Sequence, residues 1–242
     1  MDDRRRRNFL RIAGAVGAVS VAGCTGMTGG GGSETGASDS GSGSGSESQS
    51  DATETFESHS STVGIQDEPH LGDPPSETQA VIVSFEGPGC PFCARFDDNT
   101  LPQIKSELID TGKVTYYSRL MPIVKDWGNP AAQSLEAVYS RDADAYWDLK
   151  EFYFSNQDSI STDNVLDETQ SYLSQNTDLD AAAVVEEARN HGYDEEIQDD
   201  MEAGRNSGIR ATPTFTLFKS GEYVTKVEGA RGYSVFENAL QL

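Results

Sequence analysis

The order of apolar and polar positions predicts a β-α-β unit at the start of the folded part. Residues 79–85 are a β-branched apolar run bounded by proline and glycine, which is typical of a buried strand. Residues 91–108 have a helical pattern, with a bend expected at Pro102 because proline cannot donate to the helical ladder. Residues 113–121 are predicted as a second strand.

A long helical block and a second group of strands follow. Between residues 131 and 206 apolar positions recur at spacings of three and four, which predicts three to five short helices. A hairpin is predicted from the apolar runs 213–218 and 223–227, which are joined by Ser220-Gly221, and residues 233–242 close the chain as a helix. The pattern therefore indicates an α/β fold.

Several aromatic residues in the helical block have two candidate roles. They either pack in a core or line a substrate groove, and their helical spacing favours the core. These residues are Tyr146, Trp147, Phe152 and Tyr153. Trp127, in the loop before them, is open to either role.

The first 23 residues have the pattern of an export signal rather than of a folded domain. Arg4 to Arg7 precede an apolar stretch at 12–23, which is too short to span a bilayer as a helix. The run R-R-N-F-L from Arg6 resembles a twin-arginine signal. The stretch ends in V-A-G-C at Cys24, which resembles a site of lipidation. The alternative is an ordinary signal with a chance cysteine.

Residues 24–70 are predicted to be a disordered linker. Glycine, serine, threonine and acidic residues dominate its first part, and such a composition buries too little apolar surface to order the chain. The folded domain is therefore expected over 71–242, with a helical insertion at about 130–206.

The charge of the chain excludes one class of function. Its 242 residues contain 18 Lys and Arg against 40 Asp and Glu, a formal net charge of −22. Such an excess repels nucleic acid, so we expect no nucleic-acid partner. It also resembles the composition of salt-loving archaeal proteins, in which salt screens the self-repulsion. The alternative is a protein that is merely acidic and soluble.

The pair Cys90 and Cys93 is the strongest chemical signal in the chain. Two cysteines at this spacing can supply half of a metal site, form a structural disulfide or cycle as a redox couple. The three histidines of the chain do not have ligand spacing, so we expect no metal and no cofactor. A structural disulfide closing a four-residue loop would stabilise the fold little.

The position of the pair favours the redox couple. Cys90 follows a predicted strand and precedes a helix that Pro91 can open. The N–H groups and dipole at a helix start favour a thiolate, which makes Cys90 the expected nucleophile. Cys93, one turn later, is then the resolving thiol that attacks a mixed disulfide formed at Cys90.

Two motifs together resemble the DsbA-like branch of the thioredoxin superfamily. The first joins Phe85, the C-P-F-C run from Cys90 and the pair Arg95-Phe96; the second is G-I-R-A-T-P-T-F from Gly208. The resemblance covers roughly residues 71–242 and implies a thioredoxin-like fold, a central mixed sheet flanked by helices, with a helical insertion between the motifs.

The resemblance also implies roles for residues beside the cysteines. Pro213 would be a cis-proline facing the pair, although an ordinary trans turn proline is the alternative. Thr212, with Pro91 and Phe92, would contact an extended substrate segment, as in strand addition.

The chain departs from the family pattern at three positions. Relatives often carry an acid where this chain has Ser84 and an aspartate where it has Gly87. Glu86 is a candidate substitute for proton transfer, and a solvated loop acid is the alternative. Phe92 stands where the most oxidising members carry histidine, so we expect a less extreme oxidant.

The sequence thus predicts an extracytoplasmic, lipid-anchored thiol–disulfide oxidoreductase that forms or reshuffles disulfides in exported proteins. Its expected partners are protein thiols or disulfides and a membrane redox partner that resets the Cys90–Cys93 pair. No dimerisation domain is visible, so we expect a monomer. The alternatives are a reductase or isomerase, or a lipoprotein that keeps the fold and only binds a peptide or protein beside Pro213.

Overall fold

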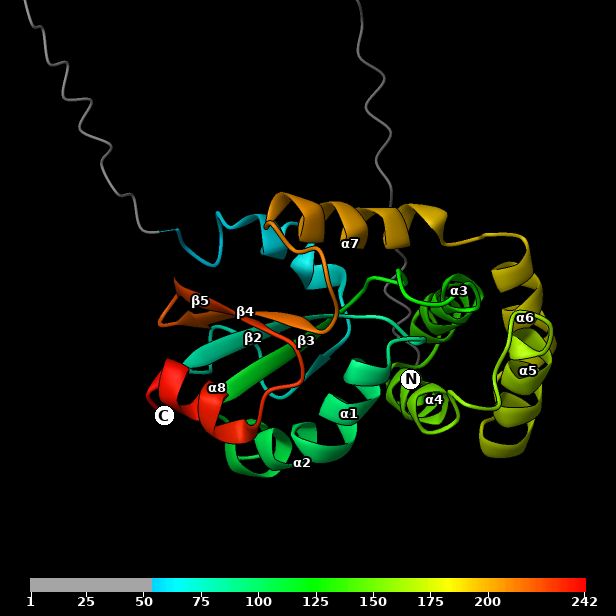
Figure 1. The fold of residues 1–242 in the computed structure, drawn as a ribbon, viewed down its shortest axis with the longest axis horizontal. Helices are drawn as coiled ribbons and strands as arrows, with labels where there is room; N and C mark the ends of the chain where they lie inside the picture. The colour runs from blue at the N-terminus through cyan, green and yellow to red at the C-terminus, as the bar shows by residue number, and fades with distance from the viewer. Residues whose placement is uncertain (1–53) are drawn as a thin grey trace, which may run out of the picture. The chain divides into compact units, whose positions relative to one another are not determined.

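A computed structural model describes residues 54–242, in which five strands form one mixed sheet (Figure 1). The strand order is β1 (His70–Leu71), β3 (Val114–Leu120), β2 (Ala80–Glu86), β4 (Thr214–Lys219) and β5 (Glu222–Glu228). β2 runs parallel to β3 and antiparallel to β4. The predicted α/β class, the β-α-β unit and the hairpin are therefore confirmed.

Both faces of the sheet are covered by helices, which explains why every residue of the central strand β2 is buried. One face packs against α1 (Pro91–Asn99) and the closing helix α8 (Tyr233–Leu240), and the rings of Phe96 and Phe236 both contact Phe215 there. The other face is covered by α7 (Asp194–Asn206) and by the segment that precedes β1 (Figure 1).

The first helical stretch is interrupted near its proline. The structure divides it into α1, α2 (Leu101–Ile104) and a π-helical turn, η3 (Lys105–Ile109), with Thr100 between α1 and α2. Pro102 has no N–H to donate and its ring crowds the preceding turn, which accounts for the break. The sequence predicts a bend at this point, and the structure has a complete break in the helix.

The helical insertion contains five helices, which fits the predicted number. They are α3 (Gly128–Tyr139), α4 (Ala143–Ser155), α5 (Val165–Asn176), α6 (Ala181–Arg189) and α7. The first four enclose a core of their own, in which Tyr146 and Tyr153 are fully buried and Trp127 is 3% exposed. Trp147 and Phe152 pack against the same core, so the aromatic residues serve packing, as their spacing favours.

The ordered part begins earlier than the composition suggests. Two 3₁₀ turns, η1 (Ser60–Thr62) and η2 (Ile65–Asp67), precede β1, and this segment packs on the sheet. The Phe56 ring lies 5.3 Å from that of Phe218, and the His59 ring stacks on Tyr223 at 4.6 Å. The expected linker end at residue 70 is therefore too late, because a few anchoring side chains order a mostly polar segment. Residues 1–53, including the expected signal and Cys24, lie outside the described part.

Within residues 54–242, the longest apolar helices fall short of what is needed to cross a membrane.

Candidate active site

Cys90 and Cys93 lie at the start of α1, directly after β2 and a short loop. Cys90 is the N-cap of α1, its Sγ accepts a hydrogen bond from the Cys93 N–H at 3.3 Å, and Pro91 follows at the first helical position. The loop lies very close to its neighbours: a Cβ at Gly87 would come 2.5 Å from the Met121 carbonyl oxygen. Glycine is therefore required for this approach. Both cysteines are free thiols and both are buried, at 1% and 0% exposure.

The two thiols have opposite acidities. A hydrogen bond from the Cys93 thiol is the main cause that lowers the pKa of Cys90 to about 6, against the opposing effect of burial, and the N–H groups of Phe92 and Cys93 add to it. The pKa of Cys93 is raised well above its usual value by burial and by the nearby Cys90 and Glu86. Cys90 is therefore the thiolate near neutral pH, and Cys93 stays protonated.

The second motif reaches this site from the far end of the insertion. The Thr212–Pro213 peptide bond is cis, as predicted. The Thr212 carbonyl oxygen lies 3.2 Å from Cys90 Sγ and accepts a hydrogen bond from the thiol. The structure thus brings together Cys90, Cys93, Thr212 and Pro213, although about 120 positions of sequence separate the two pairs.

Pro91 and Phe92 lie on the outer side of the same helix start. Phe92 is 52% exposed, and the Arg95 guanidinium lies over its ring at 5.1 Å from the centroid. Two other exposed apolar residues, Ile123 and Val124, occupy the loop after β3 that packs beside the loop before Cys90. This exposed apolar surface is suited to contact with a polypeptide.

Glu86 ends β2 and is 1% exposed, so the alternative of a solvated loop acid is wrong. Its Oε1 accepts hydrogen bonds from Lys150 Nζ at 2.5 Å and from the Ser118 hydroxyl at 2.9 Å. Its Oε2 is buried and has no hydrogen-bond partner. A buried carboxylate with a free oxygen is an unusual feature that proton transfer can use.

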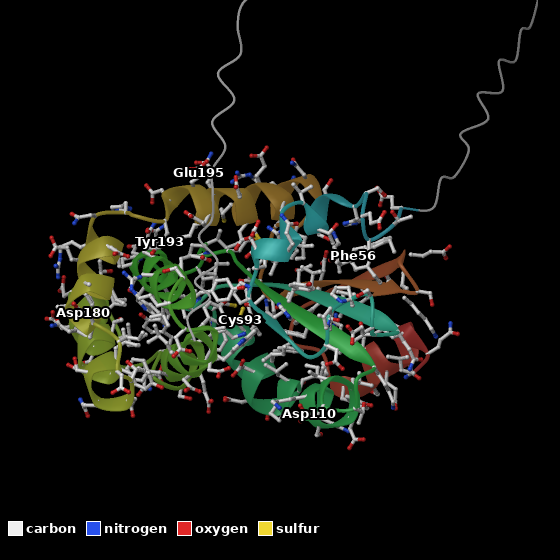
Figure 2. The ribbon with its side chains drawn as sticks, turned by 180° about the vertical axis from the view of Figure 1, so that it is seen from behind. Phe56, Cys93, Asp110, Asp180, Tyr193 and Glu195 are labelled. Carbon is white, nitrogen blue, oxygen red and sulfur yellow. The ribbon has the colours of Figure 1, made fainter. Side chains whose placement is uncertain are left out.

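Several residues of this site were not predicted from the sequence. Lys150 comes from α4 of the insertion and also lies 3.8 Å from Asp97, whose pKa burial raises to about 6. Gln157 donates from Nε2 to the carbonyls of Pro88 and Cys90 at 2.6 and 3.0 Å. The one available signal was Lys150, a lone cation among the apolar positions of α4. Figure 2 shows Cys93 at the junction between the sheet and the helices of the insertion.

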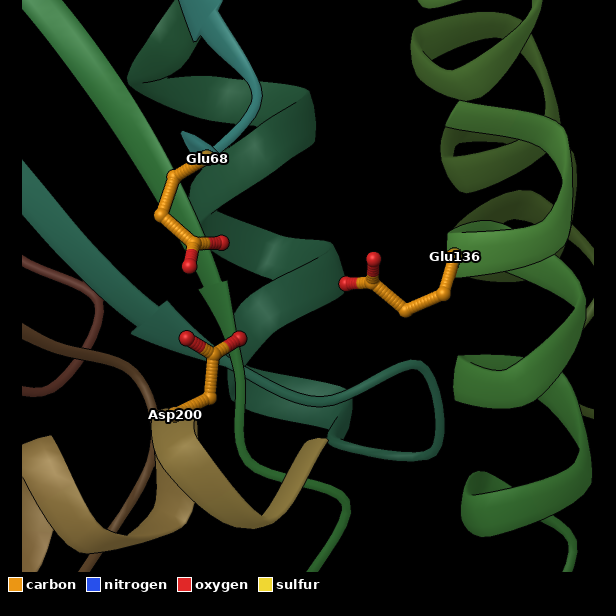
Figure 3. A group of neighbouring side chains, drawn as sticks. All are labelled: Glu68, Glu136 and Asp200. Atoms are coloured by element: carbon orange, nitrogen blue, oxygen red, sulfur yellow. The ribbon is translucent and has the colours of Figure 1, made fainter. Parts of the chain in front are cut away.

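Figure 3 shows a separate group of three carboxylates, from Glu68, Glu136 and Asp200. Glu68, Glu136 and Asp200 each place a ligand oxygen within 4.8 Å of the others, and no other such trio occurs between residues 54 and 242. Arg119 already supplies positive charge there, because its Nη1 lies 2.7 Å from Asp200 and 3.7 Å from Glu68. Burial raises the pKa of both Glu68 and Asp200. We therefore describe it as an internal ion cluster.

Comparison with known proteins shows the family to which this chain belongs. The family model described as Thioredoxin matches residues 65–229, which is more than half of the chain. The chain therefore belongs to the thioredoxin family.

The relatives within this class are named for disulfide chemistry. A probable disulfide bond formation protein D of Bacillus cereus is 34% identical over 76 residues, which are 31% of this chain and 35% of that protein. The chain thus spans about a third of that relative's length. The disulfide bond formation protein D of Bacillus subtilis is 24% identical over 156 residues, 64% of this chain and 69% of that protein.

Solved structures agree on the architecture. Oxidised BdbD of Bacillus subtilis superposes with a TM-score of 0.64 at 21% identity, covering 74% of this chain and 95% of that chain. The α-DsbA1 protein of Wolbachia pipientis gives a TM-score of 0.60 at 24% identity, covering 72% of this chain and 89% of that chain. The predicted thioredoxin-like fold is therefore confirmed.

Proposed function

We propose that this protein is a DsbA-like thiol–disulfide oxidoreductase that uses Cys90 and Cys93 as its redox couple. The observation that carries the proposal is the opposite acidity of the two buried thiols beside the cis-proline. The names of the Bacillus relatives point to the same chemistry. A low pKa makes Cys90 a good leaving group, which favours donation of a disulfide to substrates over reduction.

The proposed reaction starts from the Cys90–Cys93 disulfide. A substrate thiolate attacks Cys90 Sγ, the bond to Cys93 breaks, and a mixed disulfide forms. A second substrate thiolate attacks the substrate sulfur of that bond, so that Cys90 leaves as a thiolate. The substrate loses two electrons and two protons, and the cysteine pair gains two electrons. A membrane redox partner then removes those electrons.

Substrates would lie against the exposed side of the helix start. Phe92 and Pro91 offer an exposed surface, and the backbone at Thr212 lies beside Cys90. An extended substrate segment would align beside Pro213 by strand addition. This arrangement presents a substrate cysteine to Cys90 and keeps Cys93 covered.

The test is oxidation of a reduced, unfolded model protein at molar salt. Wild type should form disulfides in the substrate, and Cys90→Ser should not. Cys93→Ser has no disulfide to donate and should not oxidise the reduced substrate; given a substrate that already carries a disulfide, it should accumulate a mixed disulfide at Cys90, because the resolving thiol is missing. Equal behaviour of wild type and Cys90→Ser would contradict the redox role and would favour a protein that only binds peptides.

Glu86 is the proposed proton acceptor and donor for Cys93. When Cys93 leaves as a thiolate it needs a proton, and the proposal is supported by Glu86 being close enough for its charge to raise the Cys93 pKa, after burial and Cys90. Glu86→Gln should slow disulfide exchange on the order of 10²-fold and change its pH dependence. Because Lys150 then loses its partner, the double variant with Lys150→Met is the control. Recovery of the rate in the double variant would assign the effect to charge imbalance instead.

We further propose that the protein works outside the membrane as a lipid-anchored protein of a salt-loving organism. The twin-arginine motif, the short apolar stretch and Cys24 in V-A-G-C support this location. Cys24→Ser should release the protein from the membrane fraction, while Lys in place of Arg6 and Arg7 should block export. An unmodified Cys24 thiol in the intact mass of the native protein would contradict the lipid anchor.

A further inference from the structure

One face of α4 and of the turn after it packs against the redox pair and against Glu86 beside the pair. Lys150, Phe154 and Gln157 follow one another at spacings of four and three, so they lie along one side of the helix and its immediate continuation. They are 2%, 5% and 8% exposed. All three come from the insertion, which therefore supplies one wall of the site.

Phe154 covers the two thiols. Its side chain forms a buried cluster with Cys90 and Cys93, with Ala94 packed at the edge. Burial is the largest cause that raises the pKa of Cys93. The Phe154 ring is therefore part of the apolar surroundings that bury the thiols, and burial is the main cause of the raised pKa only at Cys93.

Gln157 and Lys150 fix the helix against the loops on either side of the ring. The Gln157 amide nitrogen donates to the carbonyls of Pro88 and Cys90, which hold the loop before α1. Lys150 binds Glu86 at the end of β2, and its Nζ lies 5.5 Å from the centre of the Phe154 ring. These directed contacts leave the ring little freedom over the sulfurs.

We infer that the Lys150–Phe154–Gln157 face of α4 is a positioning element for the redox pair, in which Phe154 shields Cys93 so that only Cys90 reacts with outside reagents. The inference rests on the proposed function, because shielding of Cys93 matters only if the pair is a redox couple. Its test measures thiol reactivity alone and needs no substrate. A failure to oxidise substrates would overturn the proposed function without touching this result.

Charged and titratable groups face the pair from several elements, and their effects must be held constant. Cys90 and Glu86 raise the pKa of Cys93, and Glu86 also raises the pKa of Asp97. The other groups of this set are Asp98, Tyr116, Tyr146, Lys150 and Glu151. Substitution of Phe154 leaves all of these charges in place.

The experiment is alkylation of Cys93 by iodoacetamide in the full chain carrying Cys24→Ser and Cys90→Ser, followed from about pH 6 to 10. Phe154→Ala should raise the rate near pH 8 by at least about tenfold, the thiolate gain from a pKa one unit lower. Phe154→Leu, which keeps an apolar cover, should stay near the parent. Phe152→Ala is the matched control, because Phe152 lies on the same helix but stacks on Tyr172 of α5.

A folded Phe154→Ala protein whose Cys93 rate and pH profile equal those of the parent would overturn the inference. So would an equal gain in Phe152→Ala, because that would show general loosening of the helix. If Phe154→Ala does not fold, Gln157→Ala decides. It removes both hydrogen bonds to the loop and should raise Cys93 alkylation by at least roughly fivefold, the effect of losing one ordinary hydrogen bond. An unchanged rate there would also overturn the inference.

Discussion

At the scale of single residues, two thiols that lie one helical turn apart differ in acidity, and the proposed function depends on this difference. Both are buried, but Cys90 accepts hydrogen bonds from the Cys93 thiol and from N–H groups of the helix start, whereas burial and the nearby Cys90 and Glu86 raise the pKa of Cys93. The same side chain type thus differs in acidity according to its surroundings, which is the basis of the proposed roles of nucleophile and resolving thiol.

This difference predicts the pH dependence of Cys90. Its alkylation by iodoacetamide should be half-maximal at about pH 6, because the thiolate that reacts exists above its pKa. Below that pH the rate should fall about tenfold per unit. Cys93→Ala removes the thiol hydrogen bond that most lowers the Cys90 pKa, so the midpoint should move upward, toward the usual value of 9.0. A wild-type midpoint already near 9.0 would refute the assignment.

At the scale of elements, the sequence predicts most of the secondary structure because its signals are local. The run 79–85, the helical block and the hairpin each carry a clear period or turn, and the structure confirms them. β1 has only two residues and the segment from residue 54 has few apolar anchors, so neither has a period to detect.

The sequence predicts the site residues that stand in motifs. It does not predict those that reach the site only through packing. Cys90, Cys93 and Pro213 stand in recognisable runs of sequence. Lys150 and Gln157 are ordinary polar residues until α4 docks against α1 and β2, and an isolated lysine on a helix is usually solvated. The lone cation among apolar positions marks Lys150 as unusual, but its partner and the contacts of Gln157 come only from the tertiary structure.

The ion cluster around Arg119 also acts at this scale, because it joins separate elements. Arg119 lies on β3, its partners Asp200 and Glu68 lie on α7 and just before β1, and it also donates to the Val63 carbonyl. Arg119→Met would leave buried carboxylates without a cation. The free energy of unfolding should fall by about 3–5 kcal/mol.

Urea unfolding at constant salt measures that loss. The matched control is Arg141→Met, whose pair with Glu187 is at the surface with side chains 27% and 41% exposed, and which should cost about 1 kcal/mol or less. The loss at Arg119 should be smaller near pH 5 than near pH 8, because the unpaired carboxylates take up protons as the pH falls. Equal losses at Arg119 and Arg141 would show that the cluster does not hold the elements together.

At the scale of the whole molecule, the surface stays acidic, because burial removes carboxylates along with the cations. The chain has only 18 Lys and Arg, and two of them, Arg119 and Lys150, are buried and paired with carboxylates. On α7, Glu195, Asp199 and Glu202 follow one another at spacings of four and three along an exposed face, and Figure 2 shows Glu195 on the outside of that helix. Like charges at these spacings repel.

This surface predicts a protein that salt stabilises. Between about 0.1 M and 1 M salt the Debye length falls from about 10 Å to about 3 Å, so repulsion between surface carboxylates is screened. The melting temperature should therefore rise over this range in KCl. Replacing Glu195 and Glu202 by Gln and Asp199 by Asn removes three of the repelling charges, so this variant should be more stable at low salt and should gain less from KCl. A melting temperature that does not change with salt, or an equal gain in wild type and variant, would show that self-repulsion does not limit the stability of this fold.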